Sequence, residues 1–234
     1  KPLLGEGLLT SDGDVWRRQR RLAQPAFHRQ RISGFATTMT DAALSLLDHW
    51  HVAAERKQPL EILAEMSSLT LDVTTRALFS TDVSTDSETL KQSMQGLLEH
   101  FNYRFEHFFT LPERFPTPRN RRFWHKVQAL DSVAYAIIAK RRQTGEDKGD
   151  LLSMLLAARD EETGEGMTDK QLRDEVVTFL GAGTETTAVT LAWTWYLLST
   201  HPEVDRKLRA ELAEVLRGLH AMAQPYIEQS VRGG

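Results

Sequence analysis

The stretch Phe179-Leu-Gly-Ala-Gly-Thr-Glu-Thr-Thr187 lies at the centre of a long apolar run. Residues 176–179 and 188–198 on either side of it follow a helical pattern. Glycine in a helix interior costs about 1 kcal/mol relative to alanine, and β-branched threonine adds to that cost. A helix that accepts these residues at its centre gains something there, so the stretch predicts either a close approach or a local opening of the helix.

Most of the chain shares the helical pattern, because apolar residues recur at intervals of three and four. Thr168 and Gln171 form a capping box before the central helix, and Pro202 suits the first turn of the next one. No alternating run is long enough to require a strand. We predict a mainly α fold, a helical bundle around one long central helix with a small-residue distortion, built from helices over 14–21, 32–51, 60–79, 91–109, 123–142, 150–159, 176–199 and 202–217.

Composition narrows the classes of protein. The formal net charge of −3 argues against nucleic acid as the main partner. The 234 residues include no cysteine, which removes disulfides, cysteine nucleophiles and thiolate metal ligands from this chain and fits a cytoplasmic protein. The start shows no signal-peptide order and no initiator methionine, so we interpret the chain as opening mid-sequence.

The segment 176–199 raises the question of a membrane span, because Glu185 is its only charge. An acid at the centre of a span costs about 2.5–3.5 kcal/mol, and the threonines add polarity. The capped flanks are also those of a helix in water. We therefore predict a buried central helix and no membrane span, with a transmembrane helix as the alternative.

The first candidate site is on the central helix, where Ala182, Gly183 and Thr186 share one face. Their small side chains would let a flat ligand or a diatomic molecule approach the backbone, with Glu185 as a proton path. Thr186 can bond back to the carbonyl four residues earlier or turn toward a ligand. The alternative is a tight helix crossing, with Glu185 paired to an arginine, and residue types alone favour this alternative slightly.

The second candidate site is the pair Trp16 and Arg20, which are neighbours on one helix face. An indole N–H beside a guanidinium forms a donor pair suited to a carboxylate or a phosphate. The surrounding arginines meet no acid between residues 15 and 40. The alternative is a solvated basic face, and the stacking aromatics of a nucleic-acid site are missing.

The histidines lack metal-ligand spacing. A stripe of Phe101, Phe105 and Phe108 predicts helix core, with the lining of an apolar cavity as the alternative.

Residues 182–187, Ala-Gly-Thr-Glu-Thr-Thr, resemble the (A/G)-G-x-(D/E)-T-(T/S) oxygen-binding signature of cytochrome P-450 monooxygenases. Trp16-x-x-x-Arg20 resembles the W-x-x-x-R signature that this family carries on an earlier helix, and the turn at 201–204 matches as well. The resemblance covers roughly residues 4–216 and implies a partial cytochrome P-450 fold. Residues 91–142 then resemble the two helices that roof the substrate pocket.

The resemblance implies a heme b (haem iron) cofactor. Trp16 and Arg20 would donate to a haem propionate, and Ala182 and Gly183 would lie against the haem face. The catalytic roles fall to Thr186, which would hold oxygen or its water, and to Glu185, which would relay protons.

The family also implies an apolar small-molecule substrate, O2, and electrons ultimately from NAD(P)H. The electron donor would be a ferredoxin, a flavodoxin or a reductase-type protein, met by the exposed arginines Arg17, Arg18 and Arg21. Candidate substrate-facing residues are Phe179, Phe101 and Phe105.

Two departures limit the resemblance. The axial cysteine that holds the family's iron is absent, so no metal ligand is predicted in this chain. The family's E-x-x-R helix should follow Pro202, yet Gln229 stands at the glutamate position before Arg232.

We therefore expect residues 1–217 to be a partial cytochrome P-450 helical domain and residues 218–234 to be a divergent tail, a damaged remnant of the E-x-x-R helix. The chain would be a truncated piece of a soluble, bacterial-looking enzyme, inactive by itself for lack of the thiolate. The alternative from another class is a helical binding or scaffold domain whose basic patch meets an acidic protein.

Overall fold

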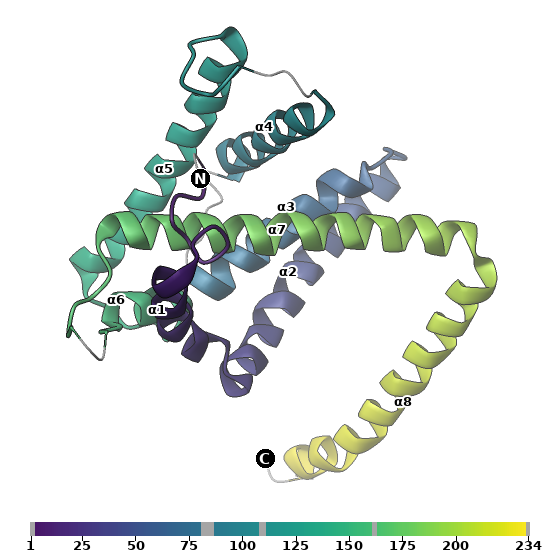
Figure 1. The fold of residues 1–234 in the computed structure, drawn as a ribbon. Coiled ribbons are helices and arrows are strands. Elements are labelled where there is room, and N and C mark those ends of the chain that lie inside the picture. Colours follow the sequence, from purple (N-terminus) through teal and green to yellow (C-terminus); the bar gives the residue numbers. More distant parts are fainter. Residues whose placement is uncertain (1–2, 81–86, 108–110, 161–162, 233–234) are drawn as a thin grey trace. The chain divides into compact units, whose positions relative to one another are not determined.

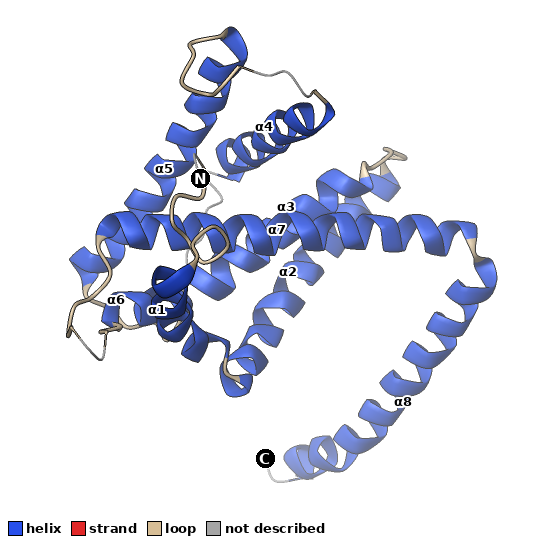
Figure 2. Ribbon diagram, in the orientation of Figure 1, coloured by secondary structure: helices blue, strands red, loops and turns tan. Residues whose placement is uncertain are grey.

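The structure, a computed structural model, describes residues 3–80, 87–107, 111–160 and 163–232. Within these residues every regular element is a helix, which confirms the mainly α fold class (Figures 1 and 2). The elements are α1 (Gly13–Ala23), the 3-10 helix η1 (Gln24–Phe27), α2 (Arg29–Glu55), α3 (Ile62–Phe79), α4 (Ser87–Glu106), α5 (Pro118–Thr144), α6 (Leu151–Ala157), α7 (Asp169–Thr200) and α8 (Pro202–Arg232).

The chain divides into two compact units, residues 1–189 and residues 190–234. In the first unit α4 packs beside α5, and α2 packs beside α3 (Figure 1). The apolar core of this unit draws on α3, α5, α6 and the first half of α7, through buried residues such as Phe79, Phe123, Leu130, Leu152 and Leu172. The second unit holds the end of α7 and all of α8.

The predicted start and stop signals of the central helix are confirmed. Gln171 accepts from the backbone N–H of Thr168 at 2.9 Å, and Thr168 Oγ1 accepts from the N–H of Gln171 at 3.3 Å. Pro202 is the first residue of α8, whose backbone stays helical through residues 218–232. No helix in the described part of the chain is both long and apolar enough to cross a membrane.

A buried ionic cluster joins three elements of the first unit. From α5, Arg141 donates to both carboxylate oxygens of Asp150 at 2.7 and 2.8 Å and to the carbonyl of Phe79 at 2.7 Å. Burial alone raises the pKa of Asp150, but the bonds from Arg141 and Ser153 lower it overall. The cluster fixes the end of α5 against α3 and the start of α6.

The N-terminal segment lies against the first turns of α7. Its backbone N–H groups at Glu6 and Leu8 donate to Asp174 at 3.0 Å and to Glu175 at 3.2 Å. Gly5 has φ +55°, and a side chain there would collide with the carboxylate of Asp174. This close approach positions the chain that leads directly into α1.

Candidate functional site

The donor pair predicted on α1 is present. The guanidinium of Arg20 lies over the ring of Trp16, 5.5 Å from its centroid, a cation–π arrangement. Trp16 is 38% exposed, and Arg20 is exposed as well. Within the described part of the chain neither side chain forms a hydrogen bond or an ion pair. Their N–H groups are therefore available to an external acceptor.

The opposite side of α1 is fixed by a single acid. Asp160, which is 4% exposed, accepts from Arg18 Nε at 3.1 Å and from Arg21 Nη2 at 3.2 Å. Arg17 pairs instead with Asp14 on the surface of α1. These arginines therefore have acidic partners within the chain. Both acids lie outside residues 15–40, the stretch without acids that surrounds the arginines in sequence. Their predicted role toward an electron donor stays a prediction.

The glycine-rich centre of α7 is a site of close approach between helices. The helix continues without a break through residues 181–187. A Cβ built on Gly183 would lie 3.1 Å from both Oγ1 and Cγ2 of Thr74, which belongs to α3. This spacing is tighter than ordinary contact, so Gly183 serves the crossing of α7 and α3.

Ala182 and Thr186 lie on the exposed side of the same stretch. The hydroxyl of Thr186 donates to the carbonyl of Ala182 at 2.7 Å, the back-bond that the sequence allowed. Glu185 is half-buried, and burial raises the pKa of its carboxyl above the ordinary value. Among the described residues it forms no ion pair with an arginine. The stretch thus offers small exposed side chains beside a carboxyl that holds its proton more firmly than a solvated one.

An aromatic contact joins η1, the 3-10 helix that follows α1, to α7. The rings of Phe27, in η1 just after α1, and Phe179 of α7 have centroids 5.4 Å apart. Phe179, Ala182 and Thr186 follow one another at spacings of three and four residues and so share one side of α7. The contact therefore sets η1, at the end of the α1–η1 segment, beside the side of α7 that carries the first candidate site. Sequence analysis missed Phe27, since nothing local marks it.

The remaining substrate-facing candidates are only partly described. Phe101 and Phe105 belong to α4, which packs against α5, but their side chains lie outside the description. Phe108 lies outside the described residues altogether.

Comparison with known proteins shows the family to which the chain is similar. The family model described as Cytochrome P450 matches residues 1–230. The chain is 38% identical over 221 residues to cyclooctat-9-en-7-ol 5-monooxygenase of Streptomyces melanosporofaciens, covering 93% of this chain and 47% of the relative. It is 34% identical over 222 residues to pentalenene oxygenase of Streptomyces avermitilis, again covering 93% and 47%.

Among solved structures, the crystal structure of the cytochrome P450DA heme domain superposes with a TM-score of 0.74 at 31% identity. That match covers 88% of this chain and 45% of the other. The chain thus spans about half the length of the relatives that it matches.

Proposed function

Since the chain belongs to the cytochrome P450 family, we propose that it carries the propionate donors and the oxygen-side helix of a haem-dependent monooxygenase. One observation carries this proposal. Trp16 and Arg20 present unsatisfied donors on α1, and the Phe27–Phe179 contact sets that segment beside the exposed small residues of α7. A haem would need both features on adjoining surfaces.

The residues present fit the edge and one face of a haem. An indole N–H and a guanidinium are the donors that a propionate carboxylate requires, and Ala182 offers no bulk against a flat ring. The cysteine thiolate that would hold the iron cannot come from these 234 residues, because they contain no cysteine. Haem bound through a thiolate supplies the redox and oxygen chemistry of the family. We therefore propose that this chain alone does not catalyse monooxygenation.

The side chains of α7 would handle protons and water on this face. The hydroxyl of Thr186, which donates to the carbonyl of Ala182, lies on the exposed side of this stretch, where it would hold oxygen or its water. The raised pKa of Glu185 keeps a proton on its carboxyl at a higher pH than a solvated acid would, which suits a proton relay. Gly183 acts through its backbone, by letting α3 approach.

We propose an apolar small molecule as the substrate of the whole enzyme, hydroxylated with one atom of O2. The Phe27–Phe179 pair supplies apolar surface beside the site, and Phe101 and Phe105 are the candidates from α4. Two relatives are named for the oxygenation of pentalenene and of cyclooctat-9-en-7-ol.

Electrons would come from NAD(P)H through a ferredoxin, a flavodoxin or a reductase-type donor in the cytoplasm. Asp160 pairs with both Arg18 and Arg21, and Asp14 pairs with Arg17, which leaves Arg20 as the arginine of α1 without an acidic partner in the described part of the chain. The same pairing weakens the alternative of a scaffold whose arginine patch meets an acidic protein.

Haem titration of the 234-residue chain tests the proposal. We expect a Soret shift on binding, and Trp16→Ala or Arg20→Ala should each lower haem affinity about tenfold, the value of one charge-assisted hydrogen bond. Trp193→Ala and Arg17→Ala remove an indole and a guanidinium outside the donor pair and should change little. After reduction under carbon monoxide, the bound haem should lack the thiolate-type band.

Two results would contradict the proposal. A chain that stays helical by circular dichroism yet gives no Soret shift does not carry the haem-binding residues. An equal loss of affinity in Trp193→Ala and Trp16→Ala would show that the donor pair has no special role.

A further inference from the structure

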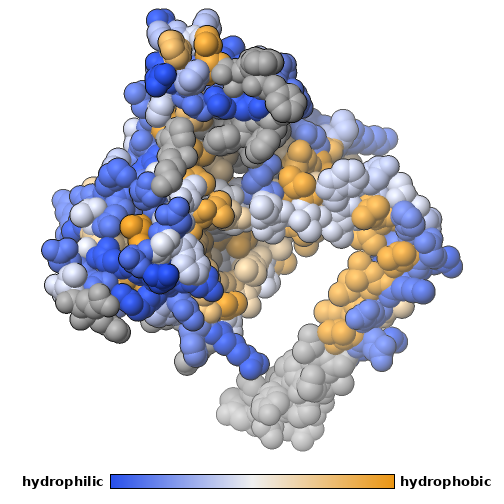
Figure 3. Space-filling model, in the orientation of Figure 1, coloured by the Kyte–Doolittle hydropathy of each residue, from blue (hydrophilic) through white to orange (hydrophobic). Residues whose placement is uncertain are grey.

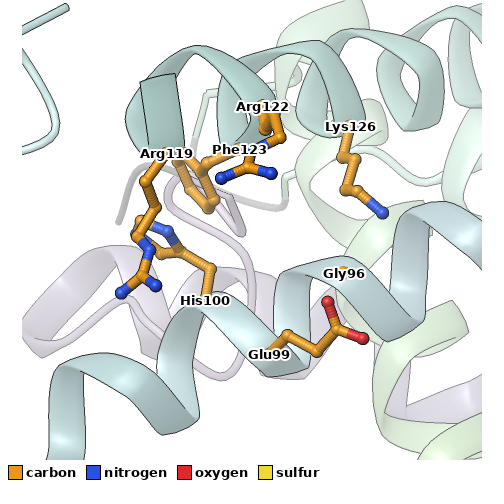
Figure 4. Close-up of a pocket in the computed structure, with 7 residues that line it drawn as sticks. All are labelled: Gly96, Glu99, His100, Arg119, Arg122, Phe123 and Lys126. Atoms are coloured by element: carbon orange, nitrogen blue, oxygen red, sulfur yellow. The ribbon is translucent and has the colours of Figure 1, made fainter. Parts of the chain in front are cut away.

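A pocket outside the candidate site opens between α4 and α5. Its volume is about 390 Å³ (Figure 4). It is lined from α5 by Arg119, Arg122 and Lys126 and from α4 by Glu99 and His100. Nothing in the proposed function uses this cluster of charges.

The three cations share one face of α5. They are spaced by three and four residues, so their side chains emerge on the same side of the helix. Figure 4 shows all three directed from α5 toward α4. Arg121, between two of them in sequence, is exposed and does not line the pocket.

Glycine on the facing helix makes room for one of these cations. Lys126 extends over Gly96, where a side chain would collide with its ammonium group. The Lys126 ammonium donates to the carbonyl of Gln92 at 2.8 Å, which holds its charge at the edge of the pocket. The cation is therefore placed by the backbone of α4, not left free in solvent.

The charges that line the pocket do not balance. Glu99 offsets one of the three cations. His100 is buried, and burial is the main cause of its lowered pKa; Arg104 and Arg119 lower the pKa further, while Glu113 opposes them. Its imidazole is therefore neutral at neutral pH, and two positive charges remain.

Arg119 carries the clearest sign of a missing acceptor. Its guanidinium lies 3.0 Å from the centroid of the Tyr103 ring. Its buried Nη1 has no hydrogen-bond partner in the described part of the chain. A buried guanidinium N–H without an acceptor costs free energy, and an anion within reach of Arg119 would remove that cost.

We propose that the α4–α5 pocket binds a phosphate group. Phosphate carries about −1.5 to −2 charge near pH 7, which matches the two uncompensated positive charges. Guanidinium groups bind phosphate oxygens through paired N–H donors, and the ammonium of Lys126 adds a point charge. The pocket exceeds one phosphate in size, so it also accommodates the small organic part of a phosphate monoester.

Isothermal titration of the 234-residue chain with inorganic phosphate tests this site. We expect saturable binding of phosphate and of glycerol 2-phosphate, and none of chloride at matched ionic strength. Arg122→Gln should weaken phosphate binding about tenfold or more. Arg121→Gln is the matched control, because it removes an equal charge one residue away, and it should leave the affinity unchanged.

Several outcomes would overturn the proposal. These are an absence of saturable phosphate binding, equal losses in Arg122→Gln and Arg121→Gln, and acetate binding as tight as phosphate, which would assign the site to carboxylates. Arg122 is exposed, so its variant should keep the fold; circular dichroism checks this, and Arg119→Gln serves as the second variant. Haem binding is a separate measurement, so the two proposals fail independently.

Discussion

At the scale of single residues, burial sets the chemistry of Glu175. Its side chain is in the first turns of α7 and is 0% exposed. Burial, the largest cause, together with the neighbouring charge of Asp174, raises its pKa to about 7, although the N–H of Leu8 donates to it and opposes the rise. The carboxyl group therefore keeps its proton across the mildly acidic range.

Glu175 should make folding weaken as pH rises. The unfolded chain releases this proton near the ordinary value of 4.5, whereas the folded chain holds it to about 7. The stabilisation is complete below the unfolded pKa and is lost as pH rises through the folded pKa, by on the order of 3 kcal/mol at most. Urea unfolding at pH 5 and pH 8 should show this loss in the native chain and its absence in Glu175→Gln. The exposed Glu211→Gln is the control, and equal pH slopes in native chain and Glu175→Gln would contradict the prediction.

At the scale of elements, α1 has two sides with different tasks. Trp16 and Arg20 face outward with free donors, while Arg18 and Arg21 hold the helix to Asp160. The acid comes from the segment between α6 and α7, about 140 residues further along the chain. The orientation of the donor pair thus depends on a loop that contributes nothing to the site directly.

Asp160→Asn should loosen α1. The change leaves the partly buried Arg18 and the exposed Arg21 without their counter-charge, and we expect a loss of about 2 kcal/mol in the free energy of unfolding. Hydrogen exchange of the α1 amides should rise more than exchange elsewhere. Asp14→Asn removes only a surface partner of Arg17 and should have little effect. Unchanged protection of α1 in Asp160→Asn would show that the anchor lies elsewhere.

Local signals could be predicted from sequence, and distant contacts could not. The capping box at Thr168 and the start of α8 at Pro202 depend on neighbours in the chain, so the sequence predicts both. The apolar pattern of the central helix begins only at Val176, because Arg173, Asp174 and Glu175 in the first turns of α7 are buried through ion pairs and hydrogen bonds that apolar periodicity does not register.

The tertiary partners of the site have no local signal at all. Asp160 and Phe27 complete the surroundings of α1 only through the fold. The glycine-rich stretch left a choice between ligand approach and helix crossing, and Thr74 of α3, which local sequence does not reveal, lies close to Gly183. Ala182 and Thr186 are exposed, and their roles on a haem face stay predictions.

At the scale of the whole molecule, α8 of the second unit carries a continuous exposed apolar surface. Along α8 the exposed apolar residues recur at helical spacing, and Figure 3 shows them gathered on one side of the described part of the helix. Contiguous exposed apolar surface is typical of an interface. The residues of this α8 stripe are Val204, Leu208, Leu212 and Val215.

The α8 stripe should make the purified chain self-associate. Its mean mass in sedimentation should rise with protein concentration, and sulfate should strengthen the effect, because it favours apolar burial. The double variant Leu208→Glu with Leu212→Glu should stay closer to a monomer. Lys207→Gln alters a neighbouring charge without touching the stripe. Identical association in all three proteins would place the contact on another surface.

The contact between Gly183 and Thr74 also bears on which substitutions this helix crossing accepts. A methyl group added at 183 would lie 3.1 Å from Thr74, so the Thr74 side chain must give way slightly or be replaced by a smaller one. The six-residue signature therefore includes only one of the two positions that meet at this crossing. The other position, Thr74, lies more than a hundred residues earlier in the chain, in α3, outside that signature.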